Sequence, residues 1–176
     1  METARQFDLE RWQSEFEQNT ARIQEIRSRN PGDQGSLRPF EGAWSVAECV
    51  QHLSITAQAF IPIWTAASAS TDHNFGKPYR IWWRWFLAGI NDPSRMRSST
   101  PNAFVPGIVP HLEVVLEVYL KEREVVRALA KEMYVGDIGG IEIRSPFASW
   151  MQYPLDYSFD LWIAHERRHL SQAEKG

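Results

Sequence analysis

The sequence predicts an all-α protein folded as a four-helix bundle. Four segments repeat apolar side chains at the spacing of a helix. Strong breakers separate these segments, and none of the chain alternates convincingly with the period of two expected for strands. The length of 176 residues and the hydrophobic content of 43% are those of one globular domain spanning residues 1–176.

The first two helices are predicted at about residues 8–29 and from residue 45 onward. Apolar residues recur at helical intervals in the first, which stops at the breaker Asn30-Pro31-Gly32. Ser45 and Glu48 have the spacing of a capping box, which marks the start of the second. Its apolar residues alternate at intervals of four and three, as in a packing seam, and Pro62 is expected to kink or end it.

The last two helices are predicted at about residues 110–133 and 154–173, with Pro110 in the first turn of the former. Residues 135–143 indicate a turn with a short extended piece. The connection between the second and third helices, about residues 66–109, is too long for a structureless loop in a compact domain. Its aromatic cluster predicts a short extra helix near 79–90, lying over the bundle.

The composition argues against several function classes. The net charge of −3 and the lack of basic runs give little support for nucleic-acid binding. The most apolar stretch, IWWRWFLAGI, is too short to span a bilayer, and the polar opening METARQFDLE does not resemble a secretory signal. Cys49 is the only cysteine, which fits a reducing, cytoplasmic setting. The eight tryptophans, expected mostly in the core, exceed what a small bundle readily covers, so a homodimer is expected.

Histidines are the strongest candidates for chemistry. His165 and His169 are four residues apart, so they lie on one face of a helix and can share a metal ion. Their segment, HERRH, also matches the zinc-protease motif. A protease of that type needs a third ligand on a later helix, and only LSQAEKG follows His169. The protease interpretation is therefore disfavoured. His52, near the margin of the second helix's apolar seam, is the other candidate, although such a residue is more often structural or exposed.

Two charged residues occupy positions that call for apolar side chains. Helical counting places Glu166 near the middle of the last helix's apolar face and Arg123 in the seam of the third helix. A buried charge without a partner costs several kcal/mol. We expect the two side chains to pair with each other, or Glu166 to orient a metal ligand from behind, or Arg123 to extend toward solvent.

Two segments resemble the DinB-like superfamily of metal-binding four-helix bundles. WSVAECVQHL (44–53) is similar to that family's W-(S/T)-x-x-E-x-x-x-H-L segment, and HERRHLSQ (165–172) to its H-(D/E)-x-x-H-x-x-Q segment. The resemblance implies that His52, His165 and His169 bind one divalent metal ion. It also implies a function, because some members of the family are metal-dependent thiol transferases that act with a low-molecular-weight thiol.

The first hypothesis is therefore a small metal-dependent enzyme, either a thiol transferase or a hydrolase-like protein, acting on a small-molecule substrate. Imidazole ligands suit Zn, Ni and Fe alike, so they do not identify the metal. The alternative is a ligand-binding or stress-associated bundle protein without enzymatic activity, in which the site is vestigial. The sequence identifies neither the substrate nor a catalytic residue: the three histidines are candidates for metal ligands, and Glu166 and Arg123 are candidates for residues that support them from behind.

Overall fold

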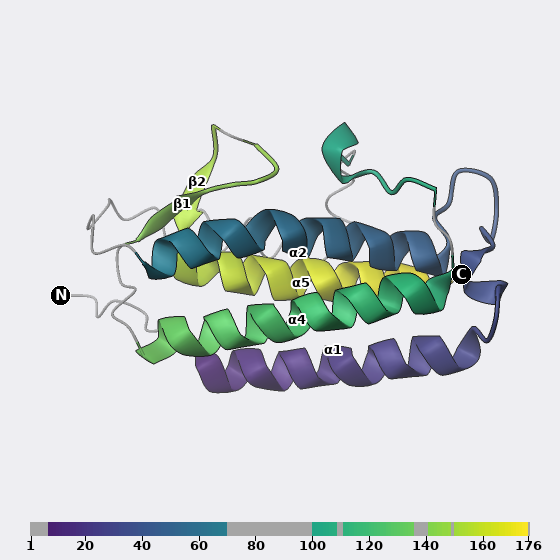
Figure 1. Cartoon of the computed structure of the whole chain (residues 1–176), viewed down its shortest axis with the longest axis horizontal. Coiled ribbons are helices and arrows are strands. Elements are labelled where there is room, and N and C mark those ends of the chain that lie inside the picture. The colour runs from purple at the N-terminus through teal and green to yellow at the C-terminus, as the bar shows by residue number, and fades with distance from the viewer. Residues whose placement is uncertain (1–6, 70–99, 109–110, 136–140, 149, 176) are drawn as a thin grey trace.

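Four long helices run side by side along the longest axis of the molecule (Figure 1). The computed structural model describes residues 7–69, 100–108, 111–135, 141–148 and 150–175. Within these residues the long helices are α1 (Leu9–Arg29), α2 (Val46–Ser68), α4 (Leu112–Val135) and α5 (Leu155–Ala173). The prediction of a helical bundle is confirmed.

The directions of the helices explain the long central connection. α1 and α5 run one way and α2 and α4 the other, as the colours of Figure 1 show. α1 packs against α4 and α5, and α2 packs against the same two helices. Because α2 and α4 are parallel neighbours, the chain must return along the bundle between them, which a short loop cannot do. The predicted helix near 79–90 lies outside the described residues.

The start of α2 is fixed by the predicted capping box. The Ser45 hydroxyl accepts a hydrogen bond from the Glu48 backbone N–H at 3.1 Å, and the Glu48 carboxylate accepts one from the Ser45 N–H at 2.8 Å. Arg38, from the α1–α2 connection, pairs with the same carboxylate. Pro62 does not end the helix, which continues to Ser68. The rigid start sets the rotation of the turns that follow, including the turn that carries His52.

Aromatic side chains fill the core between α1, α2 and α5. Trp64 stacks on Phe159 with ring centroids 4.4 Å apart, and Trp12 lies across the edge of the same Phe159 ring. Both tryptophans are fully buried, and each indole N–H donates a hydrogen bond, from Trp12 to the Phe159 carbonyl and from Trp64 to the Ser158 hydroxyl. A buried indole is favourable only when its N–H has such a partner.

A two-stranded antiparallel hairpin precedes α5, and the sequence predicted only part of it. β1 (Glu142–Arg144) lies at the extended piece expected near residue 143, but its pairing with β2 (Gln152–Pro154) was not predicted. Ile143 and Tyr153 are paired in the register, and both are buried. Strands of three residues are too short for their alternation to be recognised in a sequence. The hairpin loop carries Phe147 to the site described below.

The surface of the described residues carries a few large apolar side chains, among them Phe40, Ile108 and Trp150. Trp150 is 81% exposed, so it is an exception to the expectation that tryptophans lie in the core. None of the described helices combines the length and the apolar character needed to cross a membrane. The homodimer stays a prediction, which light scattering can test.

Candidate metal centre

Three histidines from two helices meet inside the bundle. His52 comes from α2, and His165 and His169 come from successive turns of α5, which packs against α2. His52 and His169 are buried, with 2% and 7% of their surfaces exposed, and His165 is partly buried. One nitrogen from each ring lies within 4.8 Å of the others. No Asp, Glu or Cys of the described residues joins this cluster.

The spacing of the ring nitrogens is close to that of shared metal ligands. Two imidazole nitrogens that each lie about 2.0–2.1 Å from one tetrahedral ion are about 3.3–3.4 Å apart. Nε2 of His52 and Nε2 of His165 are 3.2 Å apart. The ring centroid of His169 lies 4.3 Å from that of His52 and 4.5 Å from that of His165, and one of its nitrogens lies within 4.8 Å of a nitrogen on each of them. The three side chains could therefore hold one ion between them.

Hydrogen bonding determines which nitrogen of His52 can be a ligand. Its Nδ1 lies 2.8 Å from the backbone carbonyl oxygen of Phe104, in the 3₁₀ turn η2 (Asn102–Phe104). A carbonyl only accepts hydrogen bonds, so Nδ1 carries the proton and Nε2 presents its lone pair to the other rings. Nδ1 of His165 and Nδ1 of His169 are buried without a hydrogen-bond partner among the described residues. Among the described residues, no acceptor therefore fixes a proton on Nδ1 of either ring.

Aromatic side chains from the connections cover the cluster. Trp44, just before α2, is stacked on His169 with centroids 5.9 Å apart and lies 5.0 Å from His52. Phe147, from the hairpin loop, lies 5.8 Å from His165. These rings reduce the contact of the imidazoles with water, and a poorly solvated environment favours uncharged imidazole. Three connections thus surround the cluster: Trp44 comes from the α1–α2 connection, the Phe104 carbonyl from the crossover between α2 and α4, and Phe147 from the hairpin.

The electrostatics keep all three rings neutral at physiological pH. Burial lowers the pKa of His52, and it lowers the pKa of His165 well below its ordinary value, with further lowering by the charges of His169 and His52. The pKa of His169 is lowered to about 3, mainly by burial and then by the charges of His52 and Arg168. Neutral imidazole is the form that binds metal, so protons compete for these nitrogens only at acidic pH.

Comparison with known proteins gives one result. The family model described as the DinB superfamily matches residues 15–173. The chain belongs to the DinB superfamily. No curated protein and no solved structure matches it. The matched range includes the three histidines, their aromatic walls and the turn that orients His52, so the whole centre of this DinB-superfamily protein lies inside the family region.

Glu166 and Arg123 pair with each other, which was one of the three arrangements expected from the sequence. Arg123 Nε donates to a Glu166 carboxylate oxygen at 2.6 Å, and the two side chains are 2% and 0% exposed. Tyr119 and Asn19 also donate to this carboxylate, at 2.5 and 2.8 Å. Glu166 follows His165 in the chain, but its oxygens are directed into the core of the bundle. A carboxylate with this many donors is poorly suited to act as the general base of a zinc protease.

The sequence suggested Glu166 as the residue that orients a metal ligand, but the group that orients His52 belongs to a residue that the sequence analysis missed. The Phe104 carbonyl occupies this role for His52. Phe147 was missed as well, and Trp44 was noted only as part of the family segment. No side-chain pattern could have identified Phe104, because the contributing group is a backbone carbonyl.

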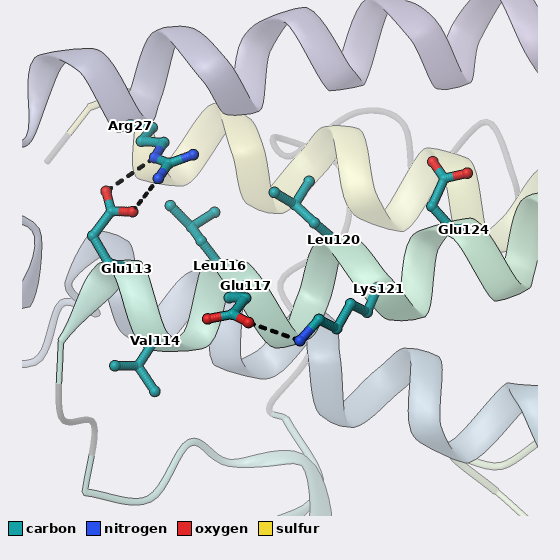
Figure 2. A pocket seen from close by; sticks show the side chains of 8 residues that line it. All are labelled: Arg27, Glu113, Val114, Leu116, Glu117, Leu120, Lys121 and Glu124. Carbon is teal, nitrogen blue, oxygen red and sulfur yellow. Dashed lines mark hydrogen bonds and ion pairs between the residues drawn. The ribbon is translucent and has the colours of Figure 1, made fainter.

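A pocket on the surface of this DinB-superfamily protein lies apart from the histidines. It has a volume of about 570 Å³ and lies along α4 beside the end of α1 (Figure 2). Glu113 pairs with Arg27 at 2.5 Å and Glu117 with Lys121 at 2.7 Å, as the dashed lines of Figure 2 show. Glu124 pairs with Arg127 at 2.5 Å, so all three acidic groups in the lining are already paired, and no histidine or cysteine lines the pocket. It offers no chemistry comparable to that of the histidine cluster.

The lowered pKa values predict that the metal-free protein is less stable in mild acid. Each ring titrates near pH 6.5 in the unfolded chain but at lower pH in the folded protein. Below about 6.5 the unfolded state thus binds more protons, and the free energy of unfolding falls by up to about 1.4 kcal/mol per pH unit for each histidine. Urea unfolding with a chelator at about pH 7.5 and about pH 5.5, either side of that pKa, measures the loss.

The control for this measurement is His169→Gln, which removes one titrating ring. Its stability should change less between the two pH values than that of the wild type. Arg38 lowers the pKa of Glu48 from its ordinary value of 4.5, so protonation of this carboxylate affects stability mainly below about pH 4.5. It therefore contributes little between about pH 5.5 and about pH 7.5. An identical pH dependence in wild type and variant would contradict the prediction.

Proposed function

We propose that this DinB-superfamily protein binds one divalent metal ion through His52, His165 and His169 and uses it in a reaction of a small molecule. The observation that carries the proposal is the convergence of three neutral imidazoles, two of them with Nε2 atoms 3.2 Å apart. Three protein ligands leave at least one coordination position for an exchangeable group, as in catalytic zinc sites.

The charge of the site favours an anion in that position. Three neutral imidazoles bring no negative charge, and no described carboxylate belongs to the cluster. The carboxylate next to His165 in the sequence, that of Glu166, is already compensated by Arg123. Arg168 adds positive charge near His165 and His169. A divalent ion there would keep its charge in a poorly solvated site, which favours binding of a thiolate, hydroxide or carboxylate.

The reaction class follows from this preference. A divalent ion with imidazole ligands lowers the pKa of a bound thiol or water and polarises a substrate oxygen. The residues of the chain would hold and surround it: the Phe104 carbonyl keeps Nε2 of His52 unprotonated, and Trp44 and Phe147 reduce the contact of the imidazoles with water. We propose thiol transfer with a low-molecular-weight thiol, or hydrolysis, with Zn, Ni or Fe as the metal.

One observation favours the alternative, a ligand-binding or stress-associated protein without enzymatic activity. The histidine rings are largely covered, and the pocket of Figure 2 lies elsewhere. Closed metal sites are typically structural, whereas catalytic sites keep an accessible position. In this alternative a metal would stabilise the bundle or the site would be vestigial.

The two functions are separated by measuring metal content and then activity. Protein purified without added metal, and then loaded separately with Zn, Ni or Fe, should retain close to one ion per chain. The loaded protein should consume a low-molecular-weight thiol in the presence of an electrophile, or hydrolyse an activated ester, and His165→Ala should do neither. Retention of metal without either activity would favour a structural site. Failure to retain any metal would favour the vestigial one.

A further inference from the structure

In its described part, residues 100–108, the crossover between α2 and α4 is attached beside the histidine cluster by one buried residue. Among residues 100–108, Phe104 is the only buried side chain, with 6% of its surface exposed. Its neighbour Val105 is 44% exposed and Ile108 is 99% exposed. In Figure 1 this turn lies over one side of α2. An isolated buried aromatic in an exposed segment is the side chain that holds the segment in place.

The Phe104 ring contacts the wall of the metal centre. It packs against Phe147 with centroids 4.7 Å apart, and Phe147 in turn contacts His165 and the α2 residue Phe60. Phe104 therefore brings the crossover and the hairpin loop together over the site. Its position depends on side chains from α2, the hairpin and α5 at once.

The backbone of the same residue orients a histidine. The turn is closed by hydrogen bonds from the Phe104 N–H to the Pro101 carbonyl at 2.8 Å and from the Val105 N–H to the Asn102 carbonyl at 3.2 Å. The Phe104 carbonyl accepts from Nδ1 of His52 at 2.8 Å. The ring of Phe104 thus anchors the turn, and its carbonyl orients His52. Because both belong to one residue, a change that displaces the ring also displaces the hydrogen-bond acceptor.

We propose that Phe104 is a positioning residue of the metal centre, whose buried ring holds its carbonyl against His52 so that Nε2 of that ring is unprotonated and directed at His165. The effect of Phe104 on metal binding rests on the proposed function, whereas its effect on the tautomer of His52 is independent of that function. Because a docked turn favours metal binding, metal binding must equally favour the docked turn.

The experiment compares Phe104→Ala with Val105→Ala, an exposed neighbour in the same segment. Nitrogen NMR of the metal-free protein reports which nitrogen of His52 carries the proton, and competition with a chelator reports zinc affinity. In the wild type and Val105→Ala, Nδ1 of His52 should be protonated. Phe104→Ala should lose this preference and bind zinc about 10–100-fold more weakly, as expected when a ligand loses its hydrogen-bond partner. Phe104→Leu, which keeps an apolar anchor, should recover much of both.

The outcomes separate this proposal from the function on which it partly rests. An unchanged tautomer and affinity in Phe104→Ala, or equal effects of Val105→Ala, would overturn the proposal. If the wild type binds no zinc, the proposed function fails, and the tautomer comparison alone decides the role of Phe104.

If Phe104→Ala does not fold, the wild-type chain supplies the test through proteolysis within residues 100–108. Zinc should slow cleavage there more than cleavage in the α1–α2 connection. If chelator competition shows that zinc is bound, an unchanged rate of cleavage within residues 100–108 would overturn the proposal.

Discussion

Replacing Glu166 with glutamine should lower the free energy of unfolding by about 3–5 kcal/mol, the loss typical when one partner of a buried ion pair is removed. Glutamine keeps the shape of the side chain but not its charge. Arg123, 1% exposed, would then carry an uncompensated charge in the core. Urea unfolding at neutral pH measures the change.

The size of the effect follows from how completely the pair is enclosed. Arg123 also donates to the Thr20 hydroxyl at 2.8 Å and the Phe16 carbonyl at 3.0 Å, and its guanidinium lies 3.9 Å from the Phe16 ring centroid. These groups hold the guanidinium in the core and prevent it from turning toward solvent. Tyr119 and Asn19, which both donate to Glu166, would meet an amide that accepts at only one atom. The network links α1, α4 and α5.

Two variants control for the interpretation. Glu117→Gln removes the same charge from an exposed pair with Lys121 on α4 and should leave the free energy of unfolding almost unchanged. Adding Arg123→Met to Glu166→Gln should recover part of the loss, because the stranded charge is removed. If Glu166→Gln is fully stable while the wild type cleaves peptides and the variant does not, the zinc-protease interpretation is correct and ours is wrong.

Replacing any one of His52, His165 and His169 with alanine should weaken zinc binding by more than 100-fold. Loss of a ligand should exceed the 10–100-fold that loss of a ligand's hydrogen-bond partner costs. Affinity is measured by chelator competition, and occupancy by metal analysis of the purified protein. His111→Ala is the matched control, since His111 is an exposed histidine paired with Asp33 at the surface. Its substitution should leave zinc affinity unchanged.

Stability provides an independent measure of the same site. Zinc at about 100 times its dissociation constant should raise the free energy of unfolding of the wild type and of His111→Ala by about 2.7 kcal/mol. The three site variants should show almost no increase at the same zinc concentration. A site variant that keeps both the affinity and the stabilisation would show that its histidine is not a ligand. Equal stabilisation of all variants would indicate adventitious binding.

The sequence by itself determined the four long helices of this fold and the three histidines of its candidate site. The helices, the capping box of Ser45 and Glu48, and the length of the crossover depend on residues close together in the chain, so their signals are local. The pairing of Arg123 with Glu166 was also accessible, because two charges at apolar positions need partners. The three histidines were selected through the family resemblance of their two segments, since spacing alone left His52 undecided between the site and solvent.

Only the tertiary structure decided the directions of the helices, the pairing of β1 with β2 and the surroundings of the histidines. Each depends on residues far apart in the chain: Trp44, Phe104 and Phe147 come from three different connections and meet only when α2 packs on α5. Short strands leave no readable alternation, and a backbone carbonyl leaves no trace in the side-chain pattern. The group that orients His52 was therefore invisible in the sequence, because every residue has a carbonyl and only the fold places this one beside the ring.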